Sequence, residues 1–149
     1  MSRRFLLLLW ALLIPFTSLE AVVAADVEFH NDGPLAELGL PFSESVRVGD
    51  LLFLSGQIGS GAGDKLAPGG ISAEANQIFL NLATTLEKRG LGMEDVIKCT
   101  VFLADIREWA AFNEVYVKHF TAPYPARSAL GANGLALNAR AEVECIAAY

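Results

Sequence analysis

The sequence predicts an α+β domain in which two helices cover one side of a sheet. Three observations lead to this class. Two apolar runs joined by Gly49 and Asp50 predict a β-hairpin, two later segments repeat apolar residues at helical spacing, and β-rich runs stand between and after them. Two amphipathic helices need an apolar sheet face to cover. The other face must then meet water, a ligand or another copy, and the many apolar strand positions favour self-association.

The first 25 residues predict a secretory signal peptide. "MSRR" is basic, "FLLLLWALLIPF" is apolar, and "TSLEAVVAA" ends in small residues, so cleavage after Ala25 fits best. An uncleaved membrane anchor is the minor alternative, because a span needs about 20 apolar residues and this run is shorter and contains Pro15. We expect residues 26–149 to form one domain, exported to the periplasm or secreted, with no stable membrane insertion after cleavage.

Charge and motifs exclude several classes of partner. Removal of residues 1–25 changes the net charge from −6 to −7. A protein this acidic lacks the clustered Lys and Arg that neutralise phosphates, which argues against nucleic acid as a main partner. The histidines, His30 and His119, show no metal-binding spacing. The glycine-rich loop "GSGAGDKLAPGG" fits neither phosphate-binding pattern, so the sequence supports neither a metal site nor a phosphate-binding loop.

The N-terminal half of the domain begins with strands. "VEFHN" can start an edge strand, and "SVRV" and "LLFLSGQI" form the hairpin, with a glycine at the first loop position. Ser72 then caps a helix that runs to about Arg89, and Gly90 ends it. One face of this helix is apolar and carries Ala75, Phe79, Leu82 and Leu86.

The C-terminal half continues with a strand, a helix and two strands. "DVIKCTVFLAD" is β-rich, and Asp105 with Glu108 predicts a capping box for a helix over about 106–120. The helical stripe, for which core packing is the default interpretation, consists of Ile106, Trp109, Phe112, Tyr116 and Phe120. "PYPAR" ends this helix, and two strands follow around the loop "NGLALN". Cys99 and Cys145 lie inside strand-like runs, and we expect two buried free thiols rather than a disulfide.

The last strand, "ARAEVECIAAY", places charges on one face. Side chains alternate across a strand, so Arg140, Glu142 and Glu144 share a face opposite an apolar one. Two like charges need water or a cation nearby, for which Arg140, Lys98 and Arg127 are candidates. A solvated face is the simplest interpretation. In a compact sheet, however, we expect at least one carboxylate in a cleft, where it can orient or deprotonate water.

Nucleophilic residues have weaker support. Ser55 in "FLSGQ" is not in a GxSxG elbow, so a hydrogen-bonding role in a site wall is preferred. Cys145 is expected to point to the apolar side.

Several motifs together resemble the RidA family, also called YjgF or L-PSP proteins. They are "VGDLLFLSGQI", "EANQIFLNLATTLEKRGLGMEDVIKCTVFLAD", "FNEVYVKHF", "YPARS" and "AEVECIA", in order over about 100 residues. The resemblance implies a chorismate-mutase-like fold with a mixed sheet, and a homotrimer with ligand clefts between subunits. It also implies cofactor-free hydrolysis of small enamines and imines of 2-amino acids to 2-keto acids and ammonia.

The resemblance also assigns site residues. Arg127 matches the arginine of the family's PARS motif, which grips the substrate carboxylate, and Glu142 matches the glutamate that positions the attacking water. Pocket-lining positions are matched by Ser55, Gly56 and Asn113. Departures fall at two further pocket positions, where the family has a tyrosine and a cysteine and this chain has Phe42 and Ala129.

The implied chemistry suits a sparse site. Bidentate pairing by Arg127 anchors a carboxylate, and Glu142 aims a water at a C=N bond that already hydrolyses slowly unaided. The resemblance also gives a reason for the position of Arg127, a cation in a run of small residues. The alternatives are a trimeric module that binds small carboxylates without catalysis, or a holdase that shields unfolded proteins. A ribonuclease is disfavoured by the acidic composition.

Overall fold

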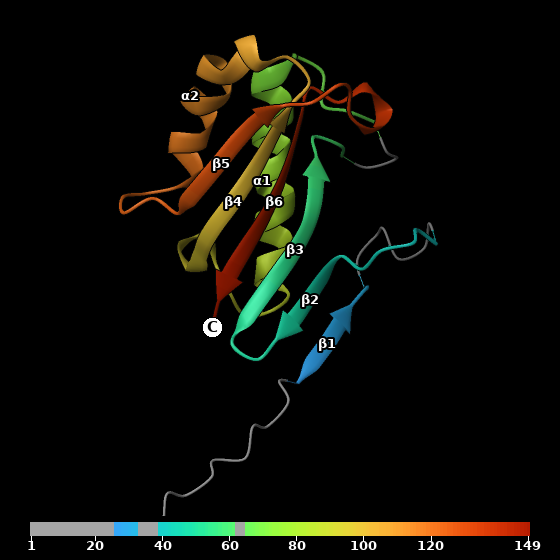
Figure 1. The fold of residues 1–149 in the computed structure, drawn as a ribbon, viewed down its shortest axis with the longest axis vertical. Coiled ribbons are helices and arrows are strands. Elements are labelled where there is room, and N and C mark those ends of the chain that lie inside the picture. The colour runs from blue at the N-terminus through green and yellow to red at the C-terminus, as the bar shows by residue number, and fades with distance from the viewer. Residues whose placement is uncertain (1–25, 33–38, 62–64) are drawn as a thin grey trace, which may run out of the picture.

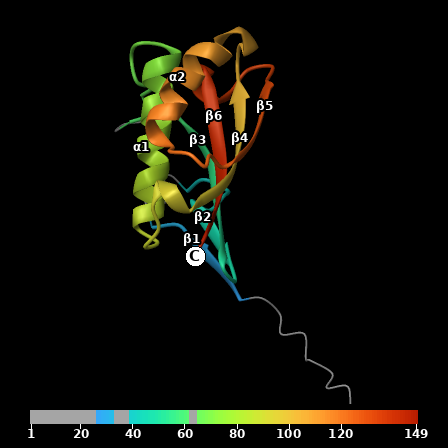
Figure 2. The same cartoon turned by 90° about the vertical axis from the view of Figure 1, so that its left-hand side faces the viewer.

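The computed structural model describes residues 26–32, 39–61 and 65–149, and the expected signal peptide lies outside them. One mixed sheet has the strand order β1-β2-β3-β6-β4-β5, in which only β4 and β5 run parallel. Both helices lie on one side of it (Figures 1 and 2), which confirms the α+β prediction. The elements are β1 (Val27–His30), β2 (Ser45–Val48), β3 (Leu51–Ile58), α1 (Ile71–Glu87), β4 (Val96–Leu103), α2 (Trp109–His119), β5 (Ala126–Gly131) and β6 (Ala141–Ala148).

The predicted hairpin and edge strand are present. β2 and β3 pair antiparallel from Val48 opposite Leu51. Gly49 starts the turn at φ +57°, a left-handed conformation that glycine adopts without steric cost. β1 pairs with β2 and forms the sheet edge.

The helix α1 begins earlier than expected. Its N-cap is Gly70, at φ +77°, and Ser72 lies inside the first turn, so the prediction of a Ser72 cap is wrong. The carbonyl of Gly70 accepts the first helical hydrogen bond, from Glu74 N–H. Ser72 is therefore already a helical residue and does not occupy the N-cap position. At the other end, α1 stops at Glu87, and Gly90 reverses the chain at φ +74°, as predicted.

The second predicted helix is divided. Residues 106–108 form a 3-10 turn, and α2 follows. The Asp105 carboxylate accepts from the backbone N–H of Arg107 at 2.9 Å, which confirms the cap. Hydrogen bonds from the Arg107 side chain lower the pKa of Asp105 to about 2. Glu108 does not complete a capping box, because its carboxylate pairs with Arg140.

The core lies between the sheet and the helices, and aromatic rings from α1 and α2 form its centre. The Phe79 ring lies 5.8 Å from Phe112, 5.7 Å from Tyr116 and 5.6 Å from Phe120, centroid to centroid. These contacts confirm core packing for three members of the stripe. Ile106 and Trp109 remain exposed, at 47% and 37%, so for them core packing is not met.

Cys99 and Cys145 form a disulfide, so the prediction of two free thiols is wrong. Both are buried, as expected, and Cys145 points to the apolar side, as alternation along the last strand predicted. The sequence did not reveal that β4 and β6 are neighbours. These strands pair antiparallel with the two cysteines directly opposite each other, 4.1 Å apart at Cα.

The face opposite the helices is apolar in part and uncovered in the chain by itself. Exposed side chains on this open face are Leu51 and Phe53 of β3 and Leu130 of β5. Single exposed apolar residues are ordinary, but several on one sheet face indicate a surface that another molecule covers. No helix among the described residues is both long enough and apolar enough to cross a membrane.

Candidate functional site

Glu142 stands on the open face of the sheet. It lies opposite Phe102 of β4 and Ile58 of β3, while its neighbours on β6, Ala141 and Val143, are buried against the helices. This confirms the predicted alternation. Among the described residues, the Glu142 carboxylate has no salt bridge. It is half-buried and available to a water or a ligand.

A β-bulge in β3 makes room for this carboxylate. The pairing of β3 with β6 shifts register between Leu54 and Gln57, so the bulge contains Ser55 and Gly56. A Cβ on Gly56 would lie only 2.1 Å from Oε1 of Glu142. The Ser55 hydroxyl donates to the carbonyl of Ser43 at 2.6 Å, which ties the bulge to the segment before β2. Gly56 therefore lies directly beside the Glu142 carboxylate, and Ser55 is its neighbour in the bulge.

Phe42 belongs to the same region by connectivity. It directly precedes Ser43, which accepts the Ser55 hydrogen bond, and its own side chain is 46% exposed. An exposed aromatic ring at this place can contact a ligand or a second copy.

Arg127 lies on the other side of the sheet. In the parallel β4–β5 pair it stands beside Cys99, a residue of the helix-covered face. Its guanidinium carbon is 4.4 Å from the ring centroid of Tyr116 and 5.4 Å from that of Trp109, both on α2. No carboxylate of the described residues forms a salt bridge with it. A guanidinium without a carboxylate partner is a ready anion site.

A hollow of about 410 Å³ opens beside Arg127. It is lined by Asn113, Tyr116, Val117, Tyr124, Pro125 and Arg127. Asn113 therefore joins Arg127, as the resemblance implied. Ala129 is two residues further along β5, on the same face, and packs against the core. Tyr116 and Trp109 were assigned by sequence only to a core stripe; their i, i+7 spacing signals a common helix face but not its contact with Arg127.

The candidate residues thus form two groups. Arg127, Asn113 and Ala129 lie on the helix side at the β5 edge, whereas Glu142, Ser55 and Gly56 lie around the open face and the β3 bulge. The expectation that Arg127 and Glu142 face one cleft is not met within a single chain. Side-chain alternation sends them to opposite faces of the sheet.

The expected cations do not neutralise the β6 glutamates. Arg140 pairs with Glu108, and Lys98 donates to the Ser128 hydroxyl at 2.9 Å. Arg127 is on the other face. Within the part of the chain that the structure describes, none of these three cations forms a salt bridge with Glu142.

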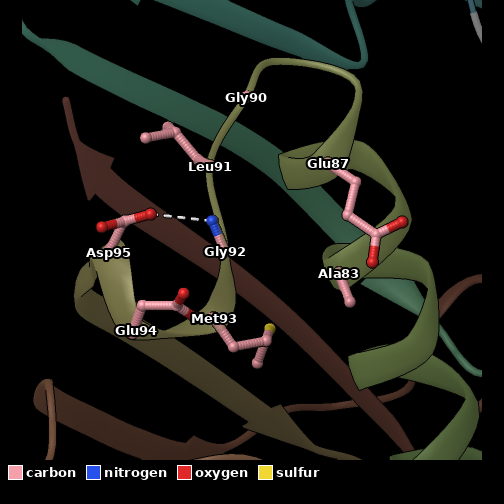
Figure 3. Close-up of a pocket in the computed structure, with 8 residues that line it drawn as sticks. All are labelled: Ala83, Glu87, Gly90, Leu91, Gly92, Met93, Glu94 and Asp95. Atoms are coloured by element: carbon pink, nitrogen blue, oxygen red, sulfur yellow. Dashed lines mark hydrogen bonds between the residues drawn. The ribbon is translucent and has the colours of Figure 1, made fainter.

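A second hollow, of about 480 Å³, lies between the end of α1 and the start of β4 (Figure 3). Its acidic members are Glu87, Glu94 and Asp95, and the Asp95 carboxylate accepts from the Gly92 N–H at 2.8 Å. This bond makes Asp95 part of a local turn. None of the candidate site residues lines this hollow.

The fold and the two groups define the class of protein: a single-sheet α+β domain in which, among the described residues, the Arg127 guanidinium at one edge and the Glu142 carboxylate on the open face have no salt-bridge partner. The chain belongs to the endoribonuclease L-PSP family, the RidA or YjgF family, whose model matches residues 36–149.

Among its relatives are proteins with named activities. The chain is 39% identical over 107 residues to a 2-iminobutanoate/2-iminopropanoate deaminase of Dermatophagoides farinae, covering 71% of this chain and 84% of the relative. It is 36% identical over 137 residues to the chloroplastic Reactive Intermediate Deaminase A of Arabidopsis thaliana, covering 89% and 72%.

Solved structures agree on the fold. The crystal structure of RidA from the Antarctic bacterium Psychrobacter matches with a TM-score of 0.71 and 34% identity, covering 74% of this chain and 89% of that one.

Proposed function

We propose that this protein hydrolyses small 2-imino acids, and their enamine tautomers, to 2-keto acids and ammonia. The observation that carries the proposal is the Arg127 guanidinium, which has no salt-bridge partner among the described residues and lines a hollow. Relatives at 36–39% identity, named imine or reactive-intermediate deaminases, support the reaction class. A short 2-imino acid has one carboxylate for the guanidinium to bind.

The chemistry follows from the two groups. The Arg127 N–H groups donate to the carboxylate of the substrate and orient its C=N bond. The Glu142 carboxylate accepts a proton from a water as the water oxygen bonds to C2. The proton passes to nitrogen and gives a carbinolamine. Its hydroxyl proton then moves to the amine as the C2=O bond forms and the C–N bond breaks, so ammonia leaves with the keto acid. An enamine first takes a proton at C3 and loses one from nitrogen to become the imine.

This mechanism needs two copies of the chain. Arg127 and Glu142 face opposite sides of the sheet, so one copy contributes its β5 edge and another its open face with the β3 bulge. Three such contacts close a cyclic trimer, the assembly that the family resemblance implies. The apolar open face supports this arrangement, because burial in the trimer would cover Phe53 and Leu130.

Export of the mature domain is part of the proposal. The signal-like composition of residues 1–25 supports it, and so does the disulfide between Cys99 and Cys145, since disulfides persist in oxidising compartments such as the periplasm. The ribonuclease implied by the family's printed name is not proposed, because the net charge of −6 disfavours binding to a phosphate backbone.

The decisive experiment compares residues 26–149 with Arg127→Ala and Glu142→Gln on freshly generated 2-iminobutanoate. We expect the wild type to accelerate keto-acid formation, Arg127→Ala to raise KM, and Glu142→Gln to lower kcat by about 10²–10⁴-fold. Calorimetry with 2-ketobutanoate should show binding lost in Arg127→Ala and kept in Glu142→Gln.

If the wild type and Arg127→Ala hydrolysed 2-iminobutanoate at equal rates, the proposed enzymatic activity would be refuted. If 2-ketobutanoate still bound the wild type and not Arg127→Ala, the protein would be a carboxylate-binding module instead.

A further inference from the structure

The Arg127 guanidinium lies in an aromatic bracket, which we define as the rings of Tyr116 and Trp109. Its Cζ is 4.4 Å from the Tyr116 centroid and 5.4 Å from that of Trp109. The two aromatic residues are seven apart on α2 and so lie on one helix face, two turns from each other. A guanidinium that stacks on an aromatic ring uses its face and keeps its N–H edge free to donate.

The two walls of this bracket differ in rigidity. The Tyr116 ring is 4% exposed and packs 4.6 Å from Phe120 and 5.7 Å from Phe79. Its position is therefore fixed by the core. Trp109 is 37% exposed, so fewer neighbours restrict its position than restrict that of Tyr116.

The Tyr116 hydroxyl does not account for the contact between Tyr116 and the Arg127 guanidinium. Its oxygen is buried and has no hydrogen-bond partner among the described residues. Burial raises the pKa of Tyr116, while the charge of Arg127 opposes that rise, so the phenol stays neutral at physiological pH. The attraction to Arg127 therefore comes from the ring and not from a phenolate.

We propose that Tyr116, assisted by Trp109, is a positioning residue that holds the plane of the Arg127 guanidinium for a planar carboxylate. This role rests on the proposed function, in which Arg127 is the anchor. Packing alone would place Tyr116 in the core without requiring a cation over its ring. The bracket reduces the side-chain freedom that the long arginine would otherwise lose when the ligand binds.

The test measures binding of 2-ketobutanoate by calorimetry and hydrolysis of 2-iminobutanoate in parallel. Tyr116→Leu removes the ring, Tyr116→Phe keeps it, and Phe112→Leu is the matched core control. Phe112 packs on Phe79, and the Arg127 guanidinium lies over the rings of Tyr116 and Trp109 and not over that of Phe112. We expect Tyr116→Leu to raise Kd and KM about tenfold with kcat within about twofold. Tyr116→Phe should equal the wild type, and Trp109→Leu should have a smaller effect than Tyr116→Leu.

Three outcomes would overturn the positioning role. The first is wild-type Kd in Tyr116→Leu, the second is an equal rise in Phe112→Leu, and the third is a tenfold rise in Tyr116→Phe. If the wild type bound 2-ketobutanoate without hydrolysing the imine, the proposed deaminase activity would be refuted. The Kd values of the variants would still test the positioning role of Tyr116. A wild type that binds no 2-ketobutanoate would refute both.

Discussion

At the scale of single residues, the position of the Glu142 carboxylate depends on Gly56, which has no side chain. Gly56 leaves the space that the Glu142 carboxylate occupies, and a Cβ there would lie 2.1 Å from Oε1 and 3.0 Å from Cδ. The obstructing atoms belong to the end of a flexible side chain. The carboxylate can therefore move away, and the fold can persist while the geometry of the site changes.

Gly56→Ala is expected to lower kcat on 2-iminobutanoate by about 10- to 100-fold, because displacement of the base by about 1 Å misaligns the water. The melting temperature should change little. Gly61→Ala is the matched control, since its Cβ meets no atom of the described residues within 4 Å. Normal kcat in Gly56→Ala would show that Glu142 needs no fixed position.

The sequence predicted Arg127 and Glu142 as site residues, but not how the two lie relative to each other in the sheet. Alternation correctly placed Glu142 opposite the apolar face of β6, and "YPARS" identified Arg127. The relative position of the two depends on the order of strands in the sheet, which local patterns do not encode.

At the scale of elements, the central strands β4 and β6 are joined both by hydrogen bonds and by the bond between Cys99 and Cys145. The two cysteines are 46 residues apart in sequence. A cross-link over such a loop restricts the unfolded chain, which stabilises the fold. The helices and the hairpin could be predicted from local spacing in the sequence. The pairing of β4 with β6, and with it that of Cys99 with Cys145, could not.

Reduction of the wild type is expected to lower the free energy of unfolding by about 2–4 kcal/mol in urea titrations. The variant with both Cys99→Ala and Cys145→Ala should have low stability that no longer responds to reductant. Titration of the oxidised wild type should find no free thiol. Two reactive thiols after denaturation without reductant would contradict the cross-link.

At the scale of the whole molecule, the two groups of the site lie on opposite faces of one sheet. Arg127 is on the helix side and Glu142 on the open side, so in the proposed mechanism a complete site needs neighbouring copies. In a cyclic trimer every copy would contribute its arginine to one cleft and its glutamate to another. Two differently damaged chains can then complement each other.

Co-expression of Arg127→Ala with Glu142→Gln is expected to restore activity that neither variant has alone. Random mixing in equal amounts leaves about a quarter of the clefts with both residues intact. Differently tagged chains allow the mixed trimers to be purified and assayed. No recovery in verified mixed trimers would place each site within one chain.

Mixing of the wild type with the doubly substituted chain is the control. About a quarter of the clefts should remain intact when the site is shared, against about a half when each chain contains its own. Subunit stoichiometry is checked by sedimentation.

The opposite placement of Arg127 and Glu142 also ties catalysis to concentration. In the proposed trimer, a copy that dissociates carries away an anchor from one cleft and a base from another. Specific activity should then decline on dilution, as the monomer becomes the main species. For an exported protein, a confined periplasmic volume would preserve the assembled sites, whereas release into a large external volume would disassemble them.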